Sequence, residues 1–576
     1  MRRLLILAVA LVAGLGMLAP PAMAQAPAPK VTITGFIDEV GTFGKNLSDY
    51  DNNYNRQKDT QATGRTRGRF DIIGEVGKAK AVLGIELDAF YGQTGANDTF
   101  LDTRSNLTGG ILQGGRQGAG ANAGFDLNTD TIGMVEIKWL YTEFPLPVPI
   151  PNTLRLGAQP FGTLATDKLA IYANGDFPGV ALSVDFTPAA RLNLTYVQVE
   201  EQLTGFKDGW VRGEDWAVIA SFGFTPFKGL TVKPVYSFFQ AQGPTSTSAR
   251  QGRGGVDFVN AYNGTAANPA SGLPNAAGRG VIENRQTIGV DATFTAGPFS
   301  LQPTVMYQFG NRHQLINATA NPSSPAGTSP YGVLGSLVKA DISAWLVDVR
   351  GAFNVGPLTL AAVGFFTSGQ NAQSNPFRSI RYYQALDTDT SYLADWGTQI
   401  FSLGIDYFHI LYNNAAGLNP GVAIGYDKYG RMGIGAKASY AITPAVTVGA
   451  GVMSNWTQYK VDTDSVLNPN SGLTPLFTGG TRPQGDSRYL GTEINGALTY
   501  RFAPGIAWDI AAAYLFAGEA LGHALTVACC GSTSGTGAAA GTGGTVVTTN
   551  NGLNGRGSKN GVDDVYTATS RIRFSF

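Results

Sequence analysis

Three arginines at alternate positions are the strongest chemical feature of the sequence. They lie in the segment Arg65-Thr66-Arg67-Gly68-Arg69. On a β-strand, residues two apart share a face, so these three guanidiniums would form a ladder at steps of about 6.8 Å. Such a cationic stripe can hold anionic or polar solutes. The same row could instead be neutralised by acids and form a salt-bridged wall.

Acidic residues surround this ladder. Asp71 and Glu75 fall on the same face of the same strand, and Glu86 and Asp88 fall on the matching face of the next strand. Charges that face lipid cost roughly 2–4 kcal/mol near the middle of a bilayer, so in a membrane barrel this face must line the lumen. We therefore expect pore-lining charges at Arg65, Arg67, Arg69, Asp71, Glu75, Glu86 and Asp88.

A second basic pair lies at the end of the chain. Arg571 and Arg573 alternate with Ile572, Phe574 and Phe576. If the last strand closes a barrel against the first, both arginines come near Asp38 and are further candidates for the pore lining. They could extend the basic wall or form an ion pair across the closing seam, and both interpretations stay open.

The segments that carry these charges alternate in polarity, as strands do when one face is apolar. In residues 80–91, Ala81, Leu83, Ile85 and Leu87 oppose Glu86 and its neighbours. In residues 134–144 the same pattern places Trp139 and Tyr141 on the apolar face. Period-two alternation of this kind predicts an all-β protein.

Short turns and long loops follow one another along the chain. Turns are expected at Phe186-Thr187-Pro188, Phe224-Thr225-Pro226, Gly297-Pro298, Gly356-Pro357, Thr443-Pro444 and Phe502-Ala503-Pro504. Long polar loops are expected at 92–130, 242–284, 369–397, 460–487 and 517–561. This asymmetry is typical of an outer-membrane barrel, an antiparallel up-and-down sheet with short periplasmic turns and long external loops. We expect about 18 strands, within roughly 16 to 20, the weakest pair lying within 398–430.

Composition and the N-terminus agree with export. Charged residues make up 14% of the chain, and the formal net charge is +0, which gives no support for nucleic-acid binding. The apolar run Leu4–Ala19 follows two arginines and is followed by Ala22-Met23-Ala24, which indicates a signal peptide over residues 1–24 rather than a membrane anchor. A short periplasmic segment, 25–30, and one barrel domain, 31–576, would follow.

A secreted β-sandwich or solenoid would also alternate in polarity. Aromatic residues near the turns favour a membrane barrel, because barrels carry aromatic girdles at the lipid interface. These residues are Phe186, Phe224, Phe294, Phe353, Tyr440 and Phe502. Closure of the sheet would also remove every unpaired edge, as the hydrocarbon region requires.

Both ends of the chain and one internal strand resemble Gram-negative general porins. The resemblance rests on Arg571-Ile572-Arg573-Phe574-Ser575-Phe576, on Val31-Thr32-Ile33-Thr34-Gly35-Phe36-Ile37-Asp38, and on Leu154-Arg155-Leu156-Gly157-Ala158-Gln159, similar to the fifth strand. Ala158 stands where many members carry Arg, and the chain is longer than general porins of 16 strands.

The resemblance implies several further properties. Phe574 and Phe576 would form the signal that the barrel-assembly machinery reads, and a homotrimer would be the assembly. The third external loop, Phe161–Pro178 with Asp167, Lys168 and Asp176, would fold into the channel and narrow it. The function implied is passive diffusion of small hydrophilic solutes or ions across the outer membrane.

Other chemistry has weak support. Asp126-x-Asn128-x-Asp130 and Asp49-x-Asp51-x-Asn53 begin like calcium loops but lack glycine at position six, so no metal and no cofactor is expected. The adjacent Cys529-Cys530 fits no redox motif, and we find no catalytic motif around His313, His409 or His523, so no enzyme is expected. Two alternatives remain: a structural or adhesive barrel, and a barrel that sheathes an electron-transfer complex.

Overall fold

The computed structural model describes much of the chain between residues 28 and 576. The described residues are 28–46, 60–91, 135–160, 172–173, 176–201, 214–242, 282–315, 328–329, 332–333, 337–371, 374, 379–384, 386, 396–401, 404–405, 429–461, 485, 487–521 and 564–576. The expected signal peptide, both calcium-like motifs and Cys529-Cys530 lie outside these residues, as do His409, His523, Asp167 and Lys168.

Within the described residues, one sheet holds nineteen strands, one of which is the two-residue β16, Ser379–Ile380. The other eighteen form the wall, which confirms the expected number. They are β1 Lys30–Lys45, β2 Thr60–Val76, β3 Ala79–Tyr91, β4 Val135–Phe144, β5 Asn152–Pro160, β6 Asp176–Thr187, β7 Ala190–Glu201, β8 Glu214–Phe227, β9 Leu230–Gln242, β10 Ile282–Ala296, β11 Phe299–Leu315, β14 Leu337–Val355, β15 Leu358–Thr367, β17 Arg431–Ala441, β18 Val446–Val461, β19 Ser487–Ala503, β20 Ile506–Ala517 and β21 Val565–Ser575. Three short elements complete the description: β12 Thr328–Ser329, β13 Gly332–Val333 and the 3-10 helix η8 Glu519–Leu521.

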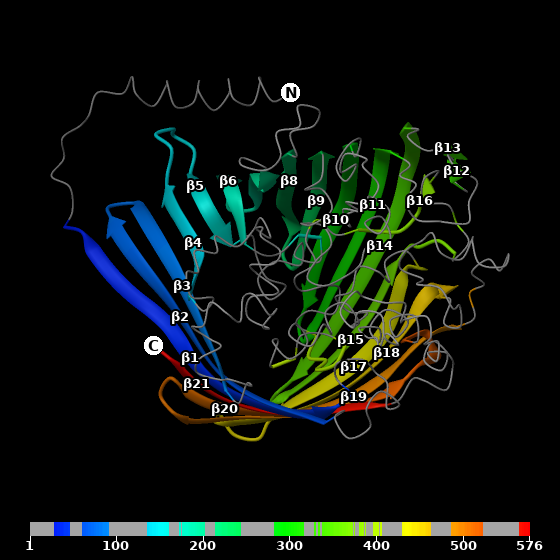
Figure 1. Cartoon of the computed structure of the whole chain (residues 1–576). Helices are drawn as coiled ribbons and strands as arrows, with labels where there is room; N and C mark the ends of the chain where they lie inside the picture. Colours follow the sequence, from blue (N-terminus) through cyan, green and yellow to red (C-terminus); the bar gives the residue numbers. More distant parts are fainter. Residues whose placement is uncertain are drawn as a thin grey trace, which may run out of the picture.

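The wall closes on itself. Each wall strand pairs antiparallel with the next along the chain, and β21 pairs antiparallel with β1 from Phe36↔Ser575 to Lys45↔Tyr566. Gly35 and Phe576 extend this seam, because each backbone N–H donates to the other's carbonyl at 3.0 Å. In Figure 1 the blue strands β1 to β3 face the green strands β10 to β15, and β20 and β21 lead back to β1. The result is an all-β, antiparallel, up-and-down barrel.

Two-residue turns join six hairpins of the described wall and a four-residue turn joins β17 to β18, whereas the seven residues 145–151 join β4 to β5. The turns Gly297-Pro298 and Gly356-Pro357 begin with glycines at φ 57° and 54°, where a side chain would be strained. One expected turn is wrong: Phe224-Thr225-Pro226 lies within β8, and the chain reverses later, at residues 228–229. The β8–β9 register shift between Phe224 and Phe227 absorbs the proline, which cannot donate to the ladder.

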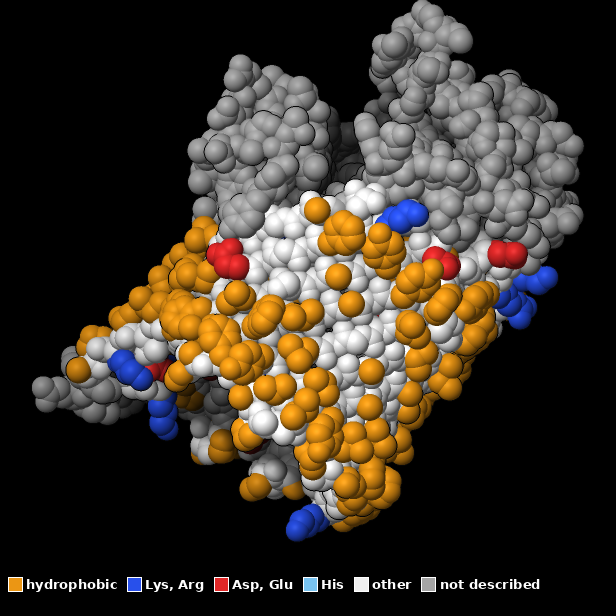
Figure 2. Space-filling model, turned by 90° about the horizontal axis from the view of Figure 1, so that it is seen from below, with side chains coloured by type: hydrophobic (Ala, Val, Ile, Leu, Met, Phe, Trp, Pro, Cys, Tyr) orange, Lys and Arg blue, Asp and Glu red, His pale blue; other side chains and the backbone are white. Residues whose placement is uncertain are grey.

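The outer face of the wall is apolar. Ile33, Leu140 and Ile434 have exposed fractions of 56%, 52% and 63%. Figure 2 shows hydrophobic side chains spread over this surface, with charged ones near its margins. Of the expected aromatic girdle, Phe186, Phe294, Tyr440 and Phe502 are exposed, whereas Phe224 and Phe353 are half-buried. Among the described residues, no helix is both long and apolar enough to cross a membrane.

The prediction for Trp139 and Tyr141 is wrong. Strands β3 and β4 pair with a register shift in which Lys138 is the additional residue of a bulge. A bulge reverses the side-chain alternation beyond it. Ile137, before the bulge, stays on the outer face, whereas Trp139 and Tyr141 point into the barrel.

The connection between β15 and β17 also differs from its prediction. We expected 369–397 to be a long polar external loop, yet Tyr382, Tyr383 and Trp396 are buried inside the barrel. Tyr383 and Trp396 join an apolar cluster with side chains of the inner wall, and the removal of aromatic surface from water explains the inward course. The described residues within 398–430 contain no strand, which is why the wall has eighteen strands rather than twenty.

Candidate channel lumen

A chain of ion pairs crosses the inner wall from β20 to β5. At its start, Asp509 of β20 accepts a 2.7 Å hydrogen bond from Nη2 of Arg571. Next, Arg573 of β21 donates to both carboxylate oxygens of Asp38 in β1, through Nε and Nη2, each at 2.5 Å. Arg573 therefore forms the ion pair across the closing seam that one of the two sequence interpretations described, whereas Arg571 pairs on the other side of its strand, with β20.

The arginine ladder of β2 forms the middle of this chain. Arg67 lies 2.9 Å from one oxygen of Glu86, and Arg69 lies 3.9 Å from the other. The Arg69 guanidinium also stacks over Trp139, 4.1 Å from the ring centroid. Arg65 is buried on the same face. Arg67 and Arg69 are thus ion-paired to Glu86 on the inner face of the wall, and a pore-lining role for the ladder stays a prediction.

The acids expected on this face have different partners. Asp71 accepts a 2.8 Å hydrogen bond from the Trp139 indole, so an aromatic residue that was expected on the outer face supports the ladder. Glu75 lies 3.7 Å from Lys30. Asp88 is in register with Arg67, but its side chain lies outside the description.

Two further pairs continue the wall beyond the ladder. Glu143 of β4 lies 2.7 Å from Lys80 and 2.7 Å from Arg155. Arg191 of β7 donates from Nε and Nη2 to Asp185 of β6, at 2.5 and 2.9 Å. The sequence reasoning missed these residues; Glu143 in particular shares its face with Trp139 and Tyr141, which the alternation had assigned to the outside.

In these pairs the cation is the more exposed partner. The exposed side-chain fractions are 33% for Arg573 against 3% for Asp38, and 25% for Arg69 against 2% for Glu86. For Arg191 the fraction reaches 58%. Within these described ion pairs, the cation is therefore more accessible than the acid.

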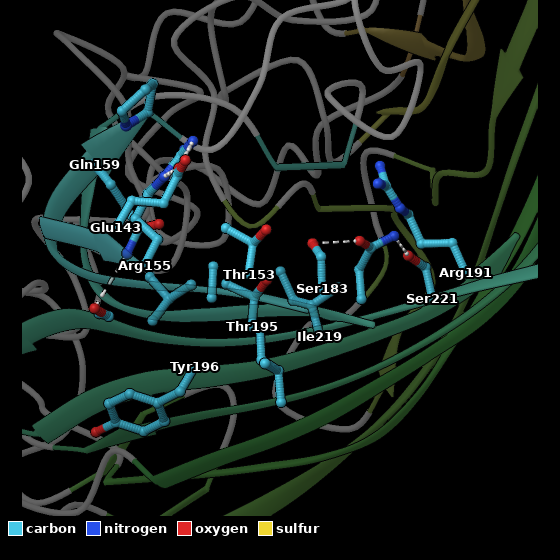
Figure 3. Close-up of a pocket in the computed structure, with 16 residues that line it drawn as sticks. Glu143, Thr153, Arg155, Gln159, Ser183, Arg191, Thr195, Tyr196, Ile219 and Ser221 are labelled. Atoms are coloured by element: carbon cyan, nitrogen blue, oxygen red, sulfur yellow. Dashed lines mark hydrogen bonds and ion pairs between the residues drawn. The ribbon is translucent and has the colours of Figure 1, made fainter. Parts of the chain in front are cut away.

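A hollow of about 280 Å³ lies along the inner wall of β4 to β8. Figure 3 shows Glu143 and Arg155 at one end, Arg191 and Ser221 at the other, and Tyr196 on the opposite side of the strands. Hydroxyl and amide groups line the hollow between the two arginines: Thr153, Ser183, Asn193, Thr195 and Ser221. This surface can replace part of the hydration shell of a polar solute.

The expected constriction in residues 161–178 is only partly described. Tyr172 is fully buried, and its hydroxyl donates to Ser237 of β9 at 2.8 Å. This residue therefore lies inside the barrel, against β9. Asp176 begins β6, in register with Pro160, and its side chain lies outside the description. A constricting role for Asp167, Lys168 and Asp176 stays a prediction.

On the inner face of the β9–β19 half of the wall, a group of charges is fully buried. Glu283 and Arg312 are fully buried and joined at 2.5 Å, and Arg285 lies beside them. The inserted residues 379–386 cover these side chains. Within the described part of the chain, no three His, Cys, Asp or Glu side chains form a group able to hold a metal ion.

Comparisons with known proteins were made at three levels. No protein-family model and no curated protein matches the sequence. The fold is similar to crystal structures of OccK8 (OprE) from Pseudomonas aeruginosa (9% identity, TM-score 0.44, 95% of this chain and 98% of that one) and OccAB4 from Acinetobacter baumannii (8%, 0.43, 96% and 99%). At this identity and these TM-scores, the likenesses assign no function. In its own architecture, the described part of the chain is a closed antiparallel barrel with eighteen wall strands.

Proposed function

We propose that this protein is an outer-membrane porin, which lets small hydrophilic solutes diffuse passively through its lumen. The contrast between the two faces of the wall carries the proposal. Apolar side chains such as Leu140 cover the outside, whereas ion-paired and hydroxyl side chains face the inside. A dry protein core would not leave cations such as Arg191 and Arg573 partly exposed to water on its inner surface.

The proposed passage runs along the β20–β8 half of the wall. The described inserted residues gather on the other half, where Tyr172, Gln384 and Phe401 are buried against β9 to β19. On the β20–β8 half, the more exposed members of the described ion pairs are cations. We therefore expect a preference for anionic solutes. The arginine ladder of β2 would lie beneath the more exposed cations and add to their positive potential.

A liposome swelling assay tests the proposal. Vesicles that contain the refolded protein should swell in isotonic solutions of small sugars, and the rate should fall steeply as the sugar becomes larger. Vesicles prepared with the unfolded chain are the control. A folded protein that leaves vesicles impermeable to the smallest solutes would contradict the porin function and favour an adhesive or scaffolding barrel.

A further inference from the structure

The connection between β15 and β17 is held to the inner wall at two separate places. The first is Gln384. Its side-chain oxygen accepts hydrogen bonds from Arg285 Nη1 at 3.2 Å and from Arg312 Nη2 at 3.0 Å. Its backbone exchanges a pair of bonds with the Gln308 amide, at 2.7 and 3.0 Å. This anchor fixes residues 379–386 against β10 and β11.

The second anchor is Glu493 of β19. Its Oε1 accepts from the backbone N–H of Gln399 at 2.6 Å, and its Oε2 accepts from those of Ile400 and Phe401 at 3.1 and 2.9 Å. The carboxylate is fully buried. Three successive N–H groups turned toward one carboxylate make an anion-binding nest, which is a strong and direction-specific contact.

A neighbouring contact supports the same segment. Lys437 of β17 donates from Nζ to the backbone oxygen of Trp396 at 2.8 Å, and its ammonium lies 4.5 Å from the Trp396 ring centroid. Lys437 and Glu493 belong to different strands, so residues 396–401 are tied to a broad part of the wall.

We propose that Glu493 is a positioning residue that keeps the passage open, by holding residues 396–401 against the β17–β19 wall and away from the cationic half of the lumen. The proposal rests on the porin function proposed above. A carboxylate suits this task because it only accepts hydrogen bonds and can take all three N–H groups at once. A glutamine would direct its own NH₂ group at one or more of these donors, so residues 396–401 would lose hydrogen bonds to the wall.

The test compares single-channel currents of the full barrel in planar bilayers. In Glu493→Gln, the fraction of time spent closed should rise by about tenfold over wild type, because the released segment enters the passage. Glu493→Asp keeps the carboxylate and should restore most of the steady current. Asp291→Asn is the matched control: Asp291 is a buried inner-wall acid that accepts a hydrogen bond from Thr304 of the next strand, and its loss should leave the closed fraction at the wild-type value.

Each outcome has a distinct meaning. A folded Glu493→Gln barrel with a steady current, of wild-type size or larger, would overturn the proposal. A wild-type barrel that conducts no current would instead contradict the porin function itself. If Glu493→Gln does not fold, Lys437→Met provides the second variant, since it removes the bond to Trp396 and should raise the closed fraction by about threefold. An unchanged closed fraction in that variant would equally overturn the proposal.

Discussion

Arg573 of the last strand grips Asp38 of the first strand through two parallel hydrogen bonds of 2.5 Å. The same guanidinium lies over the ring of Phe36, 4.2 Å from its centroid. A bidentate pair of this kind is specific in geometry as well as charge, so it fixes the register in which the barrel closes. Arg573, a residue of the C-terminal segment 571–576, therefore contributes directly to the closure of the barrel.

Loss of this seam contact should destabilise the barrel. Arg573→Gln leaves the buried Asp38 without its cation, and we expect the free energy of unfolding to fall by about 2–3 kcal/mol, below the range for fully buried pairs because Arg573 is one-third exposed. Urea unfolding in detergent micelles, followed by tryptophan fluorescence, measures the change. Lys30→Gln is the control, because Lys30 and Glu75 form a long, exposed pair. Equal stability of both variants would contradict a special role for the seam.

Gly84 makes room for Trp139. A Cβ atom built on Gly84 would lie 2.1 Å from the indole nitrogen of Trp139, which donates to Asp71 and stacks on Arg69. Gly84→Ala should displace the indole and destabilise the barrel by about 1–3 kcal/mol. Near-UV circular dichroism reports the ring's environment, and urea unfolding reports the stability.

Gly74→Ala on the neighbouring strand is the control for this substitution. An added Cβ at Gly74 meets no atom within 4 Å. If both alanine variants kept the wild-type spectrum and stability, the close packing of Trp139 on Gly84 would be contradicted.

Phe576 should affect assembly of the barrel in the cell more than refolding of the purified chain in detergent. Its two backbone bonds to Gly35 do not depend on the side chain, and its ring is 45% exposed, so we expect the ring to contribute little to the stability of the folded seam. If the barrel-assembly machinery reads this residue, Phe576→Ser should reduce the folded protein in the outer membrane severalfold while refolding in detergent stays near wild type. Ser575→Ala is the control. Equal loss in both settings would reassign Phe576 to stability alone.

The wall could be predicted from sequence because it follows local rules. Alternating polarity and proline turns are properties of short segments, and they place the strand at residues 80–91, which is β3, and the turn at Pro357 correctly. The ion pair of Arg573 with Asp38 was one of two predicted outcomes, since closure of a barrel must bring its first and last strands together.

Two features could not be predicted from the sequence, because they depend on contacts between segments that are distant in the chain. The bulge at Lys138 reverses the faces of Trp139 and Tyr141, and the available sequence signal was the consecutive run Trp139-Leu140-Tyr141, which interrupts the alternation. The inward course of the β15–β17 connection depends on Glu493, more than ninety residues away. Adjacent tyrosines at 382–383 within an otherwise polar segment were the available sign of burial.

Arg191 should contribute to the selectivity of the channel. It is the most exposed of the ion-paired arginines of the passage and lines the polar hollow. Arg191→Gln should shift the reversal potential in a salt gradient toward that of a cation-selective pore. Lys339→Gln is the control, because Lys339 alternates with the buried Ala340 on the other face of β14 and loses the same charge. Equal shifts in both variants would contradict a luminal role for Arg191.

The most direct test of the porin function is the conductance of the mature wild-type chain, refolded in detergent and added to a planar bilayer under a salt gradient. We predict steady, ohmic current steps with a reversal potential that indicates anion preference. Neutralising Arg65, Arg67 and Arg69 together should move that potential toward cations. A demonstrably folded barrel that carries no current would contradict the channel, and a cation-selective current would contradict the cationic surface assigned to its passage.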